Sequence, residues 1–214
     1  MGRAALNLAA VEEKAWKELV SCNPDEVCRR ASVHFDKNSN EYVVRSYGCS
    51  FYVSLNKRNI VCNASYGDAL LNTAGYFFRS SLLWYLIHAK DAGIYGKLVK
   101  PENLKGGQLF VSGSHVLPLD KVAEKYGADK AGYLKKGIEL GGELLNYGDA
   151  SLRIEPFPRL PMTLVLWLED EEFPARAELM VDSSCIVHLP VDVIWYIAMT
   201  TVLLISGEQG KEGH

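Results

Sequence analysis

Cys185 and His188 form a C-x-x-H pair close to Asp182, and these three side chains could carry chemistry together. A cysteine, a histidine and an aspartate that meet in space can act as a nucleophile, its base and the group that orients the base. The cysteine and the histidine could instead be two ligands of a metal ion, although a structural zinc site needs two more. Cys22 and Cys28 are the other close pair, but their spacing is wider than the usual gap in zinc motifs. The alternative is packing, because a free cysteine commonly behaves as a small buried apolar residue.

A run of four acidic residues begins at Glu169 and ends before Phe173. Its carboxylates could bind a divalent cation, or one of them could act as a general base. A calcium loop usually spaces its carboxylates at alternate positions and contains a glycine, whereas these are contiguous. We therefore expect a solvated hairpin turn in which Phe173 packs inward. In that case Asp170, Glu171 and Glu172 would be available to bind a protein partner.

His88 lies in a strongly apolar segment near Tyr85. A histidine that projects from a helix into an apolar pocket could be an axial ligand of a haem or a corrinoid. A histidine near a helix C-terminus more commonly interacts with the helix dipole. If a ligand pocket lies between the sheet and the central helix, we expect Tyr85, His88, Asp182, Cys185 and His188 to line it. The sequence does not identify the cofactor or ligand.

Complete catalytic motifs are absent from the sequence. It contains no P-loop, no dinucleotide-binding glycine fingerprint, no G-x-S-x-G elbow and no H-E-x-x-H zinc motif. The usual hydrolase, kinase and metalloprotease mechanisms are therefore unsupported, and a non-enzymatic role is favoured.

The composition limits the kinds of protein to which this chain can belong. A chain of 214 residues with 48% hydrophobic residues can form one domain, which we expect to span residues 1–214. The net charge of -3 argues against nucleic-acid binding. The longest apolar run, residues 193–205, is too short to span a bilayer, and the N-terminus lacks a signal-peptide pattern. Five scattered cysteines are typical of a reducing compartment, so we expect a cytoplasmic protein; the sequence does not predict its oligomeric state.

The spacing of apolar residues predicts the elements that position these side chains. Residues 7–20 form an amphipathic pattern, and Asn23 followed by Pro24 predicts the cap of a second helix that runs to about residue 30. Stretches rich in β-branched and aromatic residues follow, and turn residues separate them, which predicts a meander of hairpins. The expected strands span residues 41–45, 50–55 and 59–62.

A long apolar helix is expected at the centre of the core. Asn72 or Thr73 would cap it, and Gly93 would end it after Ala92. Further along the chain we expect strands at residues 108–111, 151–155, 162–168 and 176–181, and helices at residues 119–126, 129–145 and 190–206. Because strands and helices occur in runs, the sequence predicts an α+β fold, with a largely antiparallel sheet of hairpins packed against the central helix and the C-terminal helix.

Several motifs in the last third of the chain carry a family resemblance. They are residues 157–161 leading into 164–167, the acidic turn at 170–175, and residues 180–183. In these motifs the chain resembles an uncharacterised family of domains of unknown function, DUF3786, found mainly in anaerobic bacteria and archaea. This chain has Val191 and Asp192 where members carry an acidic pair, so a function of that pair would not carry over.

The resemblance implies no established activity. Some relatives are joined to iron–sulfur or corrinoid-associated domains, which implies a setting in anaerobic one-carbon or redox metabolism. From the resemblance and the acidic turn we expect an accessory or binding protein that acts with a metallocofactor protein. The alternative is a protein, either an enzyme or a simple binding protein, that holds a small molecule or cofactor in the pocket described above.

Overall fold

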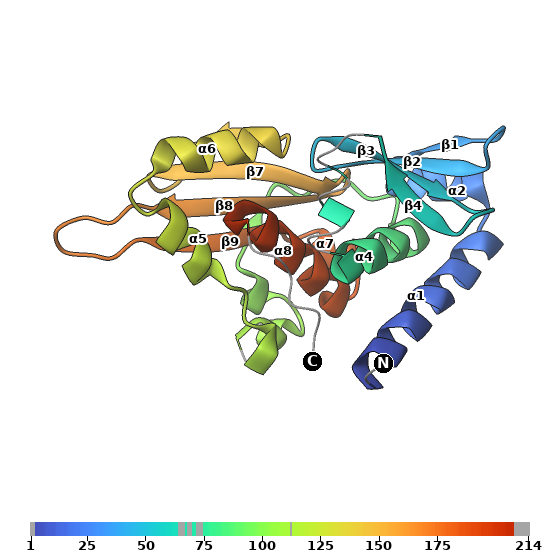
Figure 1. Ribbon diagram of the computed structural model, residues 1–214, viewed down its shortest axis with the longest axis horizontal. Coiled ribbons are helices and arrows are strands. Elements are labelled where there is room, and N and C mark those ends of the chain that lie inside the picture. Colours follow the sequence, from blue (N-terminus) through green and yellow to red (C-terminus); the bar gives the residue numbers. More distant parts are fainter. Residues whose placement is uncertain (1–2, 64–66, 68–69, 72–74, 112, 208–214) are drawn as a thin grey trace.

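The computed structural model describes residues 3–63, 67, 70–71, 75–111 and 113–207, and it combines helices with two antiparallel sheets (Figure 1). The first sheet is a meander in the order β1-β2-β3-β4, made of β1 (His34–Asp36), β2 (Glu41–Ser46), β3 (Cys49–Ser54) and β4 (Asn59–Cys62). The second sheet has the order β5-β9-β8-β7-β6, made of β5 (Leu98–Val99), β6 (Glu143–Leu145), β7 (Ala150–Phe157), β8 (Leu160–Trp167) and β9 (Arg176–Asp182). The predicted α+β class and the antiparallel pairing are confirmed, but the strands divide into two sheets.

The helices cover one face of the second sheet and fill the space beside it. The α-helices are α1 (Arg3–Ser21), α2 (Pro24–Ala31), α4 (Gly75–His88), α5 (Leu119–Tyr126), α6 (Lys130–Glu139), α7 (Cys185–His188) and α8 (Val191–Ser206). Short 3-10 helices are η1 (Pro101–Asn103), η2 (Gly107–Val111) and η3 (Gly113–His115). Helices α5, α6 and α8 lie on the same side of the second sheet, and α4 packs between α1 and α8 (Figure 1).

Local sequence explains the start and the end of α2. The side chain of Asn23 accepts hydrogen bonds from the N–H groups of Asp25 and Glu26, and Pro24 occupies the first helical position. These are the cap and the N-terminal proline that the sequence predicts. The helix ends at Ser32, which has a left-handed backbone with φ of 55°.

The two sheets meet at the turn between β2 and β3. The N–H of Tyr47 in this turn donates to the carbonyl of Glu155 in β7 over 3.0 Å. Gly48 and Gly141 pass so close that a Cβ on Gly141 would lie 2.7 Å from the Cα of Gly48. The hydroxyl of Tyr47 lies 2.8 Å from that of Thr201 in α8, so the turn is also tied to the C-terminal helix.

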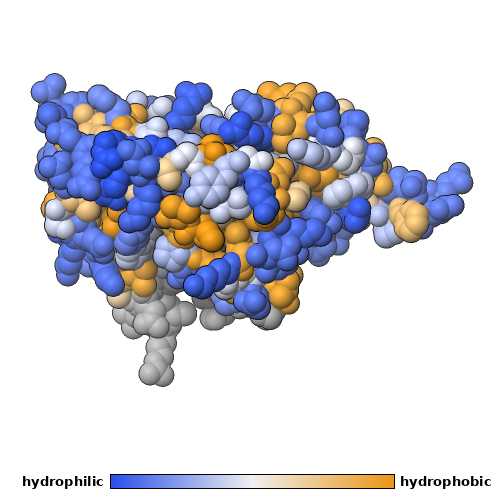
Figure 2. All heavy atoms as spheres, turned by 180° about the vertical axis from the view of Figure 1, so that it is seen from behind, coloured by the Kyte–Doolittle hydropathy of each residue, from blue (hydrophilic) through white to orange (hydrophobic). Residues whose placement is uncertain are grey.

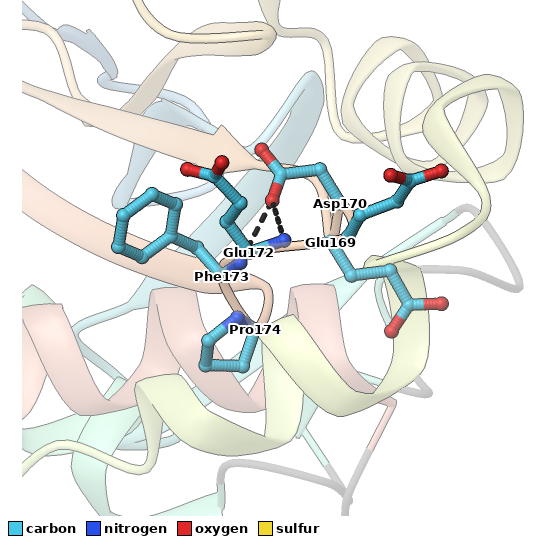
Figure 3. Close-up of a pocket in the computed structure, with 6 residues that line it drawn as sticks. Glu169, Asp170, Glu172, Phe173 and Pro174 are labelled. Atoms are coloured by element: carbon cyan, nitrogen blue, oxygen red, sulfur yellow. Dashed lines mark hydrogen bonds between the residues drawn. The ribbon is translucent and has the colours of Figure 1, made fainter.

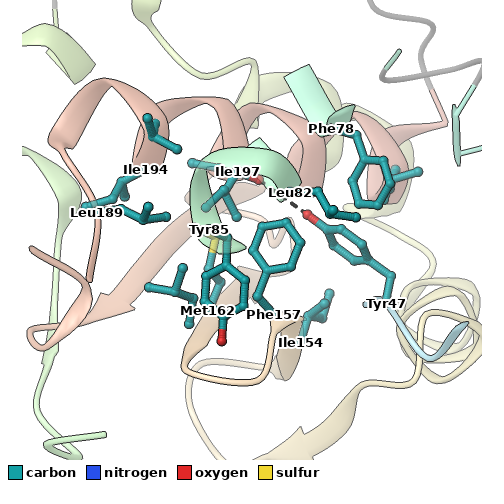
Figure 4. Packing of buried hydrophobic residues seen from close by; sticks show 14 of the residues in the cluster. Tyr47, Phe78, Leu82, Tyr85, Ile154, Phe157, Met162, Leu189, Ile194 and Ile197 are labelled. Atoms are coloured by element: carbon teal, nitrogen blue, oxygen red, sulfur yellow. Dashed lines mark hydrogen bonds between the residues drawn. The ribbon is translucent and has the colours of Figure 1, made fainter. Parts of the chain in front are cut away.

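The buried core lies between α4, α8 and the strands (Figure 4). Tyr85 of α4 stacks on Phe157 at the end of β7, with ring centroids 4.7 Å apart and planes 11° apart. Phe78, two turns earlier on the same face of α4, packs against Phe51 at 4.7 Å. Full burial of each such side chain stabilises the fold by about 1.5–3 kcal/mol. Helix α4 is therefore the expected central helix.

The bounds of the central helix differ from the prediction at its end. The helix stops at His88, and residues 89–97 run on as an irregular segment. The predicted cap at Asn72 or Thr73 lies outside the described residues.

Two elements in the middle of the chain were predicted incorrectly. Residues 107–111 form the 3-10 helix η2 in place of a strand. The helix predicted for residues 129–145 stops at Glu139, because Gly141 has a φ of +71° that reverses the chain. Residues 143–145 then form β6, an edge strand that pairs with β7. The short strands β1 and β5 were not predicted.

Candidate functional site

The acidic turn lies at the tip of the long hairpin formed by β8 and β9. This segment, Glu169–Pro174, is called the acidic hairpin below. All six of its residues are exposed, and it projects beyond the end of the second sheet (Figure 1). From behind, the same projection is a narrow and mostly hydrophilic arm (Figure 2). Its base is held to the body by a hydrogen bond from the N–H of Glu169 to the carbonyl of Gly127, at 3.1 Å.

One of the four carboxylates folds the turn. Oδ1 of Asp170 accepts hydrogen bonds from the N–H groups of Glu172 and Phe173, at 2.8 and 2.7 Å (Figure 3). The N–H of Asp170 also donates to the carbonyl of Phe173 at 3.0 Å. This is an Asx turn, so the aspartate has a structural role. Among the residues that the structure describes, none forms an ion pair with Glu169, Glu171 or Glu172, so these carboxylates are left for other partners.

The prediction that Phe173 packs inward is wrong. Its side chain is 66% exposed, the largest exposed fraction among the large apolar residues of the described chain. The reason is geometric, because the hairpin extends past the helices and the sheet, so no core lies within reach of the ring. An exposed aromatic ring therefore accompanies the carboxylates at the tip (Figure 3).

A shallow hollow of about 400 Å³ continues the acidic surface at the base of the hairpin. It lies between the hairpin and α5, and its lining is rich in carboxylates: Asp120, Glu124, Asp129 and Glu169. Two of these carboxylates have local partners, because Glu124 pairs with Lys121 at 2.9 Å and Asp129 caps α6. Lys125, which also lines the hollow, donates to the carbonyl of Ser206. The hollow and the hairpin together form one acidic end of the molecule.

Asp182 is buried at the end of β9, where it organises the neighbouring backbone. Oδ1 accepts hydrogen bonds from the N–H groups of Tyr95 and Ser184, each at 3.0 Å, and from the Ser184 hydroxyl. Burial by itself would raise the pKa of this carboxyl. The hydrogen bonds, including one from the N–H of Gly96, outweigh burial and hold the pKa below its usual value. The carboxylate is thus ionised and fully engaged.

Cys185 and His188 lie in the short helix α7, and both are buried. Burial raises the pKa of the Cys185 thiol to about 12, so the thiol stays protonated and is a poor nucleophile. The His188 Nδ1 accepts a hydrogen bond from the N–H of Lys90 at 3.3 Å, and its buried Nε2 has no hydrogen-bond partner in the described part of the chain. Among the described residues, no three His, Cys, Asp or Glu side chains come together in a way that could hold a metal ion.

Tyr85 and His88 lie in α4 but in different surroundings. The Tyr85 hydroxyl is buried, donates to the carbonyl of Ala31 at 2.6 Å and accepts from the N–H of Arg159 at 3.2 Å. Burial raises the pKa of this phenol. His88 is half-buried and stacks on Trp84 with centroids 5.0 Å apart, and burial lowers the pKa of its imidazole. Both side chains are therefore occupied by packing.

Of the five residues expected to line one pocket, Asp182, Cys185 and His188 lie near one another, whereas Tyr85 and His88 pack elsewhere. Tyr85 is in the core beside Phe157, and the space between α4 and the second sheet is filled by apolar side chains (Figure 4). Asp182 and His188 instead hold the irregular segment 89–97. Two hollows on the described surface lie at the acidic end, and none of the five residues lines either of them.

Arg159 is a central residue that the site prediction missed. Its guanidinium donates to the carbonyls of Arg30, Ala92 and Arg29 at 2.6, 2.8 and 3.1 Å, and it pairs with Asp91 at 3.1 Å. One side chain thus ties the end of α2 to segment 89–97. The sequence signal that could have found it is the Phe-Pro-Arg-Leu-Pro motif. Its two prolines restrict the backbone on both sides of Arg159.

Comparison with known families agrees with the resemblance seen in the last third of the chain. The family described as a domain of unknown function, DUF3786, matches residues 23–203. The chain belongs to this family. The DUF3786 match begins at the cap of α2 and ends within α8, so it includes both sheets and the acidic hairpin. No curated protein and no solved structure matches the chain. None of the helices in the described part of this DUF3786 chain combines the length and apolar character needed to cross a membrane.

Proposed function

We propose that this DUF3786 protein is a non-enzymatic accessory protein that docks onto a basic protein partner through the acidic hairpin. One observation carries the proposal: Glu171 and Glu172 are exposed at the tip of a projecting hairpin, beside an exposed Phe173. Within the described residues, no ion pair engages these two glutamates. Their charge is therefore available to a second molecule.

The physics of the hairpin favours docking over catalysis. Exposed like charges at one end of a protein attract an oppositely charged surface over about one Debye length, roughly 10 Å at 0.1 M salt. Charge of this kind mainly raises the association rate and selects the partner. The ring of Phe173 supplies the apolar contact that a buried anchor at an interface requires. By contrast, Cys185 and His188 are buried, and Asp182 is saturated with hydrogen bonds.

The partner we propose is an iron–sulfur or corrinoid protein of anaerobic one-carbon or redox metabolism. The support is the resemblance to family members joined to such domains. The free thiols of all five cysteines fit a reducing cytoplasm, which is the compartment we propose.

The test is a charge reversal at the tip, Glu171→Lys together with Glu172→Lys, with Asp170 left intact because it folds the turn. The matched control is Glu13→Lys together with Glu18→Lys, which changes the net charge equally on α1. Each tagged protein is expressed in cells of its own source under anoxic conditions and purified at low salt. Co-purifying proteins are then identified, and their iron and cobalt contents are measured.

We expect a metal-containing protein to co-purify with the wild type and the control, and to be lost with the tip variant. The interaction should also weaken as salt is raised. Equal recovery with the tip variant would overturn docking through the hairpin. Recovery of a partner that depends on the hairpin but contains no metal would overturn only the assignment of a metallocofactor protein.

A further inference from the structure

We propose that β6 is a self-association edge, through which two copies of this chain join their second sheets into one continuous sheet. Strand β6 is the last strand of its sheet, and among the described strands it pairs only with β7. Every second residue of an edge strand directs its N–H and C=O away from the sheet. Within the described residues, no backbone hydrogen bond joins these outward groups of Glu143–Leu145 to another segment. The inference is independent of the proposed function.

Apolar side chains accompany the open edge. Leu144 is 55% exposed and Ile138 of α6 is 57% exposed. Leu144 is directly opposite Leu152 in β7, and Leu152 packs beneath Gly137 of α6, so Leu144 lies on the face of the sheet that α6 covers. Figure 2 shows an apolar area at the upper rim of the molecule, over the region of α6. Lysine and proline often protect edge strands from association, and β6 carries neither, although it is short and carries the charged Glu143.

The chemistry of this edge suits a second copy of the chain. If two β6 strands pair antiparallel about a two-fold axis at Leu144, this leucine meets the partner's Leu144, and Glu143 lies opposite the partner's Leu145. No like charges then face each other across the strands. The same axis sets the two α6 helices side by side and antiparallel. Glu139, which pairs with Lys136 of its own copy at 4.0 Å, then comes within reach of the partner's Lys135, and this contact is repeated by symmetry.

The size of the contact sets its strength. A three-residue strand and one helix face offer less than the roughly 1,600 Å² of a standard interface, so the association should be reversible and depend on concentration. It should be seen by sedimentation velocity, measured from micromolar to several hundred micromolar protein.

The test compares Leu144→Lys and Ile138→Lys with Tyr95→Lys, which places the same charge at a 61% exposed residue away from β6. We expect the first two changes to weaken dimerisation at least tenfold and the third to leave it unchanged. All three sites are on the surface, and circular dichroism verifies that each variant is folded. A protein that is monomeric throughout the concentration range, or a dimer that Leu144→Lys does not weaken, would overturn the proposal.

A charge exchange tests the geometry of the pair. Lys135→Glu should weaken the dimer, because it sets two acidic side chains against each other. Adding Glu139→Lys to it restores opposite charges and should restore the association. If the double variant is as weak as the single one while Leu144→Lys still dissociates the dimer, the antiparallel arrangement of α6 is wrong.

Discussion

The imidazole Nδ1 of His188 accepts a hydrogen bond from the backbone N–H of Lys90, so this buried histidine is neutral and carries its proton on Nε2. Protonation of Nδ1 would bring two hydrogen-bond donors face to face, the Nδ1–H of His188 and the backbone N–H of Lys90. It would also place a cation near the guanidinium of Arg159. Burial first, and then this guanidinium, lower the pKa of His188, whereas Asp182 and a hydrogen bond with the backbone of Lys90 act in the opposite direction. The bond between α7 and segment 89–97 therefore depends on an uncharged ring.

Stability should fall in mild acid because of this histidine. The folded-state pKa of His188 lies below the unfolded value of 6.5, so its contribution is complete above that pH and is lost as the pH falls through the folded pKa. We expect the free energy of unfolding in urea to decrease between about pH 7.5 and about pH 5. His188→Gln, which keeps an acceptor for Lys90, should flatten this decrease. His88→Gln measures the part due to the half-buried histidine of α4, whose pKa is also lowered by burial. An unchanged slope in His188→Gln would contradict the assignment.

Removal of Arg159 should destabilise the fold strongly. Its side chain is only 19% exposed, and its loss leaves the carbonyls of Arg29, Arg30 and Ala92 without their donor. We expect Arg159→Ala to cost roughly 3 kcal/mol or more in urea unfolding. The control is Arg153→Ala, which removes exposed pairs with Glu143 and Glu155 and should cost less than about 1 kcal/mol. Equal costs for the two variants would show that Arg159 does not clamp these segments.

The close approach of Gly48 and Gly141 should not tolerate a methyl group. A Cβ on Gly141 would lie 2.7 Å from the Cα of Gly48, and the φ of +71° is strained for any other residue. We expect Gly141→Ala to lower the unfolding free energy by more than about 2 kcal/mol. Gly93→Ala is the control, because nothing lies within 4 Å of its Cβ position and its φ is not positive. That change should stay within about 0.5 kcal/mol of the wild type.

The Cys185 thiol should be unreactive in the folded protein. A pKa of about 12 in place of 9.0 lowers the thiolate fraction at mildly alkaline pH by roughly three orders of magnitude, since each unit is about tenfold. Alkylation followed by peptide mass spectrometry should therefore modify the half-buried Cys22, Cys28 and Cys49 first. In urea all sites should react at similar rates. Rapid alkylation of Cys185 without urea would mean that α7 opens readily or that its thiolate is stabilised.

The sequence by itself determined most of the regular elements. The cap at Asn23, the alternation in the strands around the acidic turn and the apolar helix that ends the fold are all local patterns, and local patterns specify helices and strands directly. The acidic turn was also recognised as a hairpin, because adjacent charged side chains between two strands must be hydrated and therefore mark an exposed turn. The α+β class followed from the order of these elements.

Only the tertiary structure decided where the candidate side chains lie. The strands divide into two sheets, which meet where Gly48 and Gly141 approach closely, and this contact joins residues far apart in the chain. Phe173 is exposed because the hairpin extends beyond the packed core. The sequence of the hairpin does not tell how far the core reaches. Likewise, Cys185 and His188 look reactive by residue type, but burial and the backbone of Lys90 set their chemistry. Burial and hydrogen bonding are properties of the packed chain, so spacing along the sequence does not determine them.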